Sequence, residues 1–328
     1  MELRKMLSGI LSLLMLMTTT VSADVSAPKI TGNGVKYSYV SYGSYPQTEV
    51  VCSSDKDRIQ ELKNLSESYG IKYKAVSKKT WNKIKKAKYN SNGDAKVSGV
   101  KYRRICKTDA TESYDAWQMY PWHDDTTYHY FRYDDIKWRV LQIKNNKALL
   151  LSEYALDDEK YNDTWSSVMW NIKWGNSTIR SFLNGYAASK NACKTDYRKN
   201  NFIDTAFTSK EQKKLVGKKI GTKVKDKVFL LSIHDVYNTE AATAMGFSSG
   251  DGYDVNRQCK CTTYAFAKGI YNTGTVWWWL QSPDYYSDTS YRVLYGGEID
   301  RDGTNTNDDS GALRPAILIS TNTLKKLK

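Results

Sequence analysis

The chain has few histidines, few cysteines and no long apolar run in its main part. Its three histidines and the short Cys259-x-Cys261 spacing form no recognisable zinc-binding pattern. The apolar run at residues 6–17 is shorter than the roughly 20 residues that a membrane-spanning helix needs, and no second run follows. Neither an internal repeat nor a long linker is visible, so we expect one continuous domain over residues 32–321.

The five cysteines cannot all pair within one chain, so we expect at least one free thiol. No cysteine lies directly after the apolar run, which argues against a lipoprotein anchor. The last residues, 322–328, are a basic tail without the hydrophobic segment of a lipid-anchoring signal.

The first 23 residues are typical of a secretory signal peptide. Arg4 and Lys5 precede the apolar run, and Val21 and Ala23 occupy the small-residue positions of a cleavage site. A short segment, residues 24–31, then leads into the domain. We therefore expect a protein without a transmembrane segment that is secreted, either extracellular or loosely associated with the cell envelope.

The chain is strongly basic, with a formal net charge of +14. Such a charge attracts anionic partners at long range, and outside a cell these are acidic envelope polymers or anionic glycans. The lysines are interpreted as dispersed, apart from two clusters that could be solvated helix faces: Lys83, Lys85, Lys86, Lys88 and Lys213, Lys214, Lys218, Lys219. Nucleic-acid binding is not expected from this pattern.

Local signals predict helices and hairpins without regular strand–helix alternation. Residues 128–143 and 147–152 read as strands joined by a tight turn at Asn145-Asn146. Helices are expected after Ser53 or Ser54, over residues 178–184, from Thr208 to Val216, after Ser232 and over residues 262–268. This mixture predicts an α+β fold.

The stretch from 277 to 319 holds the main candidate site. Apolar strands frame a polar segment rich in tyrosine, a residue that gives binding surfaces a large contact area at low entropic cost. We predict that it binds a ligand through Tyr285, Tyr286, Asp288, Tyr291, Arg292, Tyr295, Glu298, Asp300, Arg301, Asn305 and Asn307. An inert surface of a tyrosine-rich protein remains the alternative.

Within that segment the spacing of Asp300, Asp302 and Asp309 partly matches a calcium loop, with Gly303 at the sharp turn. The loop departs from the pattern at its first and last ligand positions, and a solvated hairpin tip explains it equally. No cofactor other than this calcium is expected.

A further set of residues is assigned to structure. On a strand, Trp277 and Trp279 face one side and Trp278 the other. Large aromatic rings are expected in the core, and arginines as buried clamps on backbone carbonyls. The structural set is Trp138, Arg180, Trp277, Trp279, Pro283, Arg314 and Pro315.

A series of short motifs supports a family resemblance. They are residues 44–47 (SYPQ), 137–141 (KWRVL), 178–184 (TIRSFLN), 228–232 (VFLLS), 277–283 (WWWLQSP) and 313–316 (LRPA). In order and spacing they resemble an uncharacterised bacterial secreted family, the domain of unknown function 6273. The C-terminal part of that family is similar to the C-type-lectin-like fold of formylglycine-generating enzymes and of retroelement-diversified variable proteins. That resemblance implies a C-type-lectin-like scaffold, mainly over residues 128–321, with an N-terminal hairpin and helix extension.

Three function hypotheses follow. The first is a secreted, non-enzymatic recognition domain for a glycan or an anionic envelope polymer. The second is an enzyme related to the formylglycine-generating class; against it, the copper-binding cysteine pair of that class has no counterpart after residue 276. The third is a structural envelope protein retained by its charge. The ligand, the disulfide pairing and the oligomeric state stay open.

Overall fold

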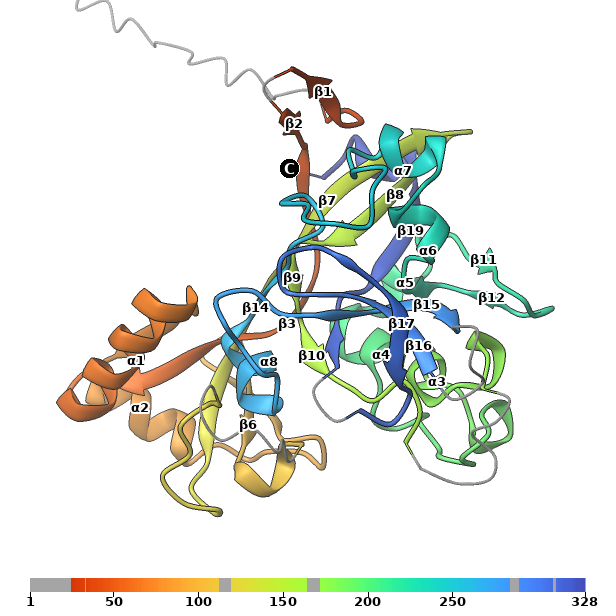
Figure 1. The fold of residues 1–328 in the computed structure, drawn as a ribbon. Coiled ribbons are helices and arrows are strands. Elements are labelled where there is room, and N and C mark those ends of the chain that lie inside the picture. The colour runs from red at the N-terminus through yellow and green to blue at the C-terminus, as the bar shows by residue number, and fades with distance from the viewer. Residues whose placement is uncertain are drawn as a thin grey trace, which may run out of the picture.

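The computed structural model describes residues 25–32, 34–111, 119–163, 172–283, 289–308 and 311–327. Within these residues the chain has the expected mixed α+β structure (Figure 1). The predicted signal peptide lies outside them. Among the described residues, no helix combines the length and apolar character needed to cross a membrane.

The largest sheet has eight strands and runs through both halves of the chain (Figure 1). Its main path, in spatial order, is β13 (Val228–Phe229), β19 (Ala316–Ser320), β8 (Lys147–Ser152), β7 (His129–Lys144), β3 (Tyr39–Cys52) and β4 (Tyr73–Val76). Two further strands lie off this path. Strand β6 (Val100–Ile105) pairs with the first residues of β7, and β5 (Asp94–Val97) pairs with β6. The predicted β7–β8 hairpin is confirmed, since Asn145 and Asn146 both adopt positive φ, at 51° and 56°.

The second sheet carries the predicted ligand-binding segment. Its five strands, in spatial order, are β10 (Asp157–Asp158), β18 (Ala312–Leu313), β15 (Trp278–Pro283), β16 (Thr289–Val293) and β17 (Ile299–Asn305). The rings of Trp277 and Trp279 meet edge to face, 4.8 Å apart, and Trp278 donates to the carbonyl of Arg257. The predicted alternation is confirmed, and all three rings are buried.

Three two-stranded pairs complete the strands. They are β1 (Lys29–Thr31) with β2 (Gly34–Lys36), β11 (Lys218–Lys219) with β12 (Lys225–Asp226), and β9 (Tyr154–Ala155) with β14 (Lys260–Cys261). None of the five cysteines is joined in a disulfide.

The helices are short and begin at side-chain caps. They are α1 (Lys56–Tyr69), α2 (Lys78–Lys85), α3 (Thr178–Asn184), α4 (Phe202–Ala206), α5 (Ser209–Gln212), α6 (Ile233–Val236), α7 (Glu240–Ala244), α8 (Thr263–Lys268) and α9 (Thr321–Leu324). The predicted span of α3 and the predicted starts of α5 and α6 are confirmed, and α8 begins one residue after the predicted position because Thr262 is its cap.

Two helix predictions were wrong in detail. The cap of α1 is Asp55, not Ser53 or Ser54, because its carboxylate accepts from the amide of Arg58. Helix α5 ends at Gln212 instead of Val216, because the amide of Val216 bonds the carbonyl of Leu318 beside the sheet.

Residues 72–104 form a projecting unit, which we call the basic lobe. It contains β4, α2, β5 and β6, at the lower left of Figure 1. A small apolar core separate from the main one holds it to β3 and β7, through Val50, Ile84, Val97, Tyr102 and Tyr130. The lobe contains 12 Lys and Arg residues and a single acidic residue, Asp94, a net charge of +11.

Candidate functional site

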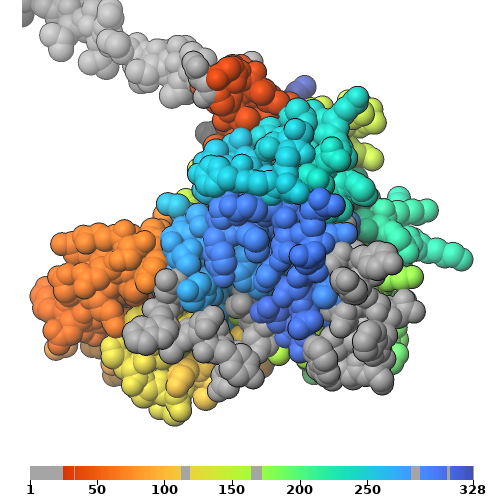
Figure 2. Space-filling view, viewed as in Figure 1, coloured from red at the N-terminus to blue at the C-terminus, as the bar shows by residue number. Residues whose placement is uncertain are grey.

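The predicted ligand-binding residues that the structure describes lie on and around the β16–β17 hairpin. This hairpin is exposed on the face shown in Figure 2, in dark blue. Tyr285, Tyr286, Asp288 and Asp309 lie outside the described residues. The structure therefore brings together only part of the predicted surface.

Both arginines of the hairpin are paired with carboxylates. Arg292 donates to Asp300 over 2.8 Å, and its guanidinium lies 4.9 Å from the ring centre of Trp277. Arg301 lies 3.4 Å from Asp251. These pairs compensate the positive charge of both arginines, so neither guanidinium is left unpaired for an anionic ligand.

The remaining predicted residues vary in exposure. Tyr291 and Tyr295 are half-buried against the main core, and the ring of Tyr295 meets that of Tyr271 at 6.0 Å. Glu298 and Asn307 are half-buried, whereas Asn305 is exposed. Each of these two tyrosines therefore packs against the core with part of its side chain and leaves the rest exposed on the surface.

Asp300, one of the possible calcium ligands, is engaged within the protein. One oxygen of Asp300 pairs with Arg292, and the other accepts from the amide of Asp302. In the described part of the chain, no group of three or more His, Cys, Asp or Glu side chains is placed to hold a metal ion. Binding of calcium there stays a prediction.

Most of the residues assigned to structure are buried. Trp138 donates to the carbonyl of Tyr42, and the buried Arg180 pairs with the buried Asp226. Arg314 donates to three backbone carbonyls, those of Ser152, Arg257 and Gln258. The carbonyl of Pro315 accepts from Ser152, and the backbone of Pro283 pairs with Ser290.

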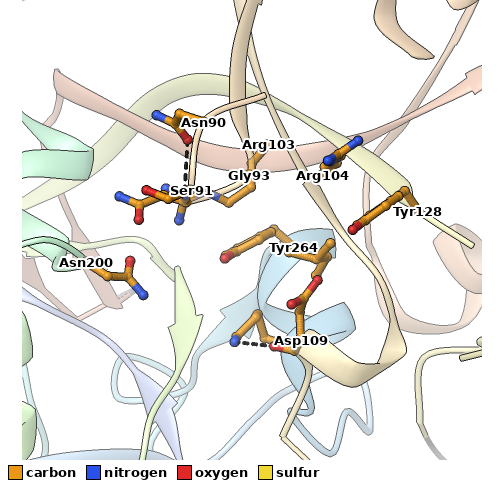
Figure 3. A pocket seen from close by; sticks show the side chains of 12 residues that line it. Asn90, Ser91, Gly93, Arg103, Arg104, Asp109, Tyr128, Asn200 and Tyr264 are labelled. Atoms are coloured by element: carbon orange, nitrogen blue, oxygen red, sulfur yellow. Dashed lines mark hydrogen bonds between the residues drawn. The ribbon is translucent and has the colours of Figure 1, made fainter. Parts of the chain in front are cut away.

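A polar pocket lined by none of the predicted ligand-binding residues lies between the basic lobe and helix α8 (Figure 3). Its volume is about 260 Å³. Its lining consists of Asn90, Ser91, Asn92, Gly93, Arg103, Arg104, Ile105, Asp109, Tyr128, Asn200, Tyr264 and Lys268. We call it the polar pocket.

Local turn chemistry builds one wall of the polar pocket. The side-chain oxygen of Asn90 accepts from the amides of Asn92 and Asp94, at 3.0 and 2.9 Å. Gly93 has a φ of 74°, and a Cβ there would lie 2.5 Å from the carbonyl oxygen of Arg104. Only glycine allows the turn to approach strand β6 this closely.

Strand β6 places two arginines at the polar pocket. Arg103 is buried and uses Nε and Nη2 to hold Asp94, at 2.8 and 2.9 Å. The guanidinium of Arg104 lies 4.6 Å from the ring centre of Tyr89 and 4.1 Å from that of Tyr128. Within the described residues Arg104 forms no ion pair. It is a fixed cation, held by aromatic faces and not by a carboxylate.

Helix α8 supplies Tyr264 and Lys268. Burial and the nearby Asp157 raise the pKa of Tyr264 to about 12, so its hydroxyl stays protonated at neutral pH. Burial by itself would lower the pKa of Lys268, but Tyr264 and the buried carboxyls on and after β10 raise it, and the amine stays charged. The ammonium group donates to the carbonyl of Asp109 over 2.7 Å.

A second cavity, of about 350 Å³, lies on another side of the same region. Its lining includes Glu49, Arg58 and His129, which bond one another and the hydroxyl of Tyr120. Burial would raise the pKa of Glu49, but His129 and Arg58 outweigh it and keep that pKa low. These buried groups satisfy one another, which is the pattern of a structural network.

One sequence signal could have indicated the polar pocket. A count of lysines and arginines in a moving window isolates residues 72–104, of which only the cluster Lys83, Lys85, Lys86 and Lys88 was singled out from the sequence, as a possible solvated helix face. No sequence pattern near residues 72–104 could show that Asn200, Tyr264 and Lys268 also line the polar pocket, because these residues lie far along the chain.

Comparison with known proteins gives one match. No curated protein and no solved structure matches the chain. Residues 145–321 match the family described as a domain of unknown function (DUF6273), which is more than half of the chain. Residues 32–144, including the basic lobe, lie outside the matched range, and the single domain over 32–321 stays a prediction. The chain belongs to the family of the domain of unknown function DUF6273.

Proposed function

We propose that the protein is a non-enzymatic recognition protein that binds an anionic ligand in the polar pocket. The observation that carries this proposal is Arg104, a guanidinium fixed between two tyrosine rings with no carboxylate partner among the described residues. A fixed, uncompensated cation binds a carboxylate or phosphate with little further ordering.

The neighbouring groups favour an acidic sugar as that ligand. The side chains of Asn90 and Asn200 line the polar pocket, and amides can donate to and accept from hydroxyls. The Tyr264 hydroxyl and the Lys268 ammonium add further donors. A sugar ring with one carboxylate uses all of these groups, whereas a simple anion needs only the cations.

Two features favour binding over catalysis. The only carboxylate that lines the polar pocket within the described residues, Asp109, already accepts from the amide and the thiol of Cys106. No histidine or cysteine lines it there. A nucleophile paired with a base, the usual mark of a catalytic site, is therefore not among the described lining residues.

The setting of this function is also part of the proposal. We propose that the protein is exported, on the strength of the signal-like residues 1–23. We also propose a C-type-lectin-like scaffold over residues 128–321, supported by the Trp-Trp, Ser-Pro and Arg-Pro-Ala landmarks. An experimental structure compared with lectin-like folds tests the scaffold, and analysis of the secreted N-terminus tests the export.

The binding test uses calorimetric titration of the protein with galacturonate and digalacturonate, with galactose as the neutral counterpart. We expect the acids to bind and galactose to bind at least about tenfold more weakly, because a charge-assisted contact is lost. Arg104→Gln should weaken acid binding by about tenfold or more.

The matched control is Arg301→Gln, which removes a guanidinium from the β16–β17 hairpin. It should leave acid binding within about twofold of the unchanged protein. If Arg301→Gln weakened binding and Arg104→Gln did not, the site would be the hairpin and the pocket proposal would fail. Equal binding of the acids and galactose would also refute it.

A further inference from the structure

Helix α2 and the residues that follow it carry a group of exposed lysines just before the segment that forms one wall of the polar pocket. Lys83, Lys85, Lys86 and Lys88 are exposed, and we call them the lysine face. None of the four forms an ion pair with a carboxylate in the described part of the chain. The buried Ile84 turns the apolar side of the helix toward the core of the basic lobe. The charges therefore point to solvent without compensation.

The lysine face is joined to the polar pocket by a short, well-fixed segment. Lys88 is followed by Tyr89, whose ring contacts Arg104 and whose hydroxyl donates to the carbonyl of Ile84 over 2.9 Å. Asn90, the next residue, lines the polar pocket. Lys88 is thus two residues from the pocket wall, which makes this segment the route by which a longer ligand would reach the lysine face.

We infer that the ligand is an acidic polysaccharide, with one sugar in the polar pocket and further carboxylates along the lysine face. This inference rests on the proposed function. A single acidic sugar would use only the groups that line the polar pocket. The row of cations beyond its rim suits a chain with anionic groups at regular intervals.

The aromatic side chains of this segment favour a polysaccharide over a single-stranded nucleic acid. Base stacking needs rings with a free face. The rings of Trp81 and Tyr89 instead pack against Tyr130, at 5.1 and 6.0 Å, and Tyr89 also covers Arg104. The lobe thus offers positive charge here while its rings are used in packing.

A purely structural role for these lysines has a different consequence. Lys83 and Lys85 lie in the last turn of α2, where cations interact favourably with the helix dipole. If this were their only role, neutralising them would lower the melting temperature without changing binding. The experiment therefore measures both.

The experiment compares two fourfold variants of the full protein. One neutralises the lysine face: Lys83→Gln, Lys85→Gln, Lys86→Gln and Lys88→Gln. Its control neutralises four exposed lysines of the family-matched part: Lys210→Gln, Lys213→Gln, Lys214→Gln and Lys219→Gln. Each is titrated with digalacturonate and polygalacturonate at several salt concentrations, and melting temperatures are recorded.

We expect the lysine-face variant to bind digalacturonate within about twofold of the unchanged protein. Its affinity for polygalacturonate should fall by about tenfold or more at low salt. The slope of log affinity against log salt should drop by about three, since each cation contact contributes a little less than one. The control variant should bind the polymer within about twofold of the unchanged protein.

Several results would overturn the inference. Equal losses in the two variants would show attraction by net charge alone. Unchanged polymer binding in the lysine-face variant would remove that face from the site. Tighter binding of single-stranded DNA or of phosphatidylglycerol vesicles than of polygalacturonate would replace the polysaccharide as the ligand. Polymer binding without any digalacturonate binding would refute the proposed function of the pocket.

Discussion

The basic lobe and the family-matched part of the chain use charge in opposite ways. The lobe has 12 basic residues and one acidic residue in 33 positions, a net charge of +11. Residues 145–321 have 22 basic and 20 acidic residues, a net charge of +2. Almost all of the protein's net charge thus lies outside the part that defines its family.

The difference extends to individual side chains. In the family-matched part, Arg180 meets Asp226 and Arg292 meets Asp300. In the basic lobe, Arg104 is stacked between rings, and the lysine face points to solvent. Paired charges hold the fold, whereas unpaired charges attract and orient an anion. We therefore place the ligand at the lobe and treat the family-matched part mainly as its support.

The largest expected effect is on a paired, buried charge. Asp226→Asn leaves the guanidinium of Arg180 buried without its counterion, and both side chains are 2% exposed or less. We expect a loss of about 3–5 kcal/mol in the free energy of unfolding. Urea unfolding measures it. Arg104→Gln is the comparison and should cost under about 1 kcal/mol. Similar losses for the two would refute the distinction between paired and unpaired charges.

An intermediate effect is expected at Asp158 on β10, whose buried carboxyl oxygens lie within hydrogen-bonding geometry of no other group in the described part of the chain. Burial, with the neighbouring Glu159 and Asp157, raises the pKa of Asp158 well above its usual value. The folded state therefore holds this proton more tightly than the unfolded chain. The resulting stability is present below the unfolded pKa, near 4, and is lost as the pH rises through the folded pKa.

Asp158→Asn removes the titrating carboxyl and with it the loss of stability at high pH. The melting temperature at pH 8 should rise by about 2 °C or more, while at pH 4 it should stay close to that of the unchanged protein. Thermal unfolding monitored by circular dichroism at both pH values measures the difference. A fall at pH 8 would mean that the carboxylate is stabilised by its surroundings.

The smallest effect is expected on the hairpin surface. Asp300→Asn breaks the ion pair with Arg292. The side chain of Asp300 is 15% exposed and that of Arg292 is 22% exposed. Such a pair contributes about 1 kcal/mol or less, and salt screens it. Urea unfolding at low and high salt should show a small difference that shrinks as salt increases. A loss above about 2 kcal/mol in the free energy of unfolding would show that this pair stabilises the fold as strongly as a buried pair.

Much of the local structure could be predicted from the sequence. The caps of α3, α5, α6 and α8 depend on residues a few positions apart, and so does the Asn145-Asn146 turn. Two helix details were wrong because other contacts competed. Asp55 caps α1 in place of a nearby serine, and the amide of Val216 bonds the carbonyl of Leu318 instead of extending α5.

The candidate site was harder to predict because its parts lie far apart in the sequence. The predicted tyrosine-rich segment was selected by composition, and composition does not show that Arg292 and Arg301 already have acidic partners. Conversely, nothing near Arg104 in the sequence shows that no carboxylate reaches it. Pairing of charges is a property of tertiary contacts.

The sequence by itself determined the net charge, the alternation of the three tryptophans and the start of most helices, because these depend on composition or on neighbours within a few residues. Only the tertiary structure decided where the charge is left unpaired. Strand β6 carries Arg103 and Arg104 to the side of helix α8, which lies about 160 residues further along the chain. The polar pocket exists because sheet pairing and core packing bring these distant segments together.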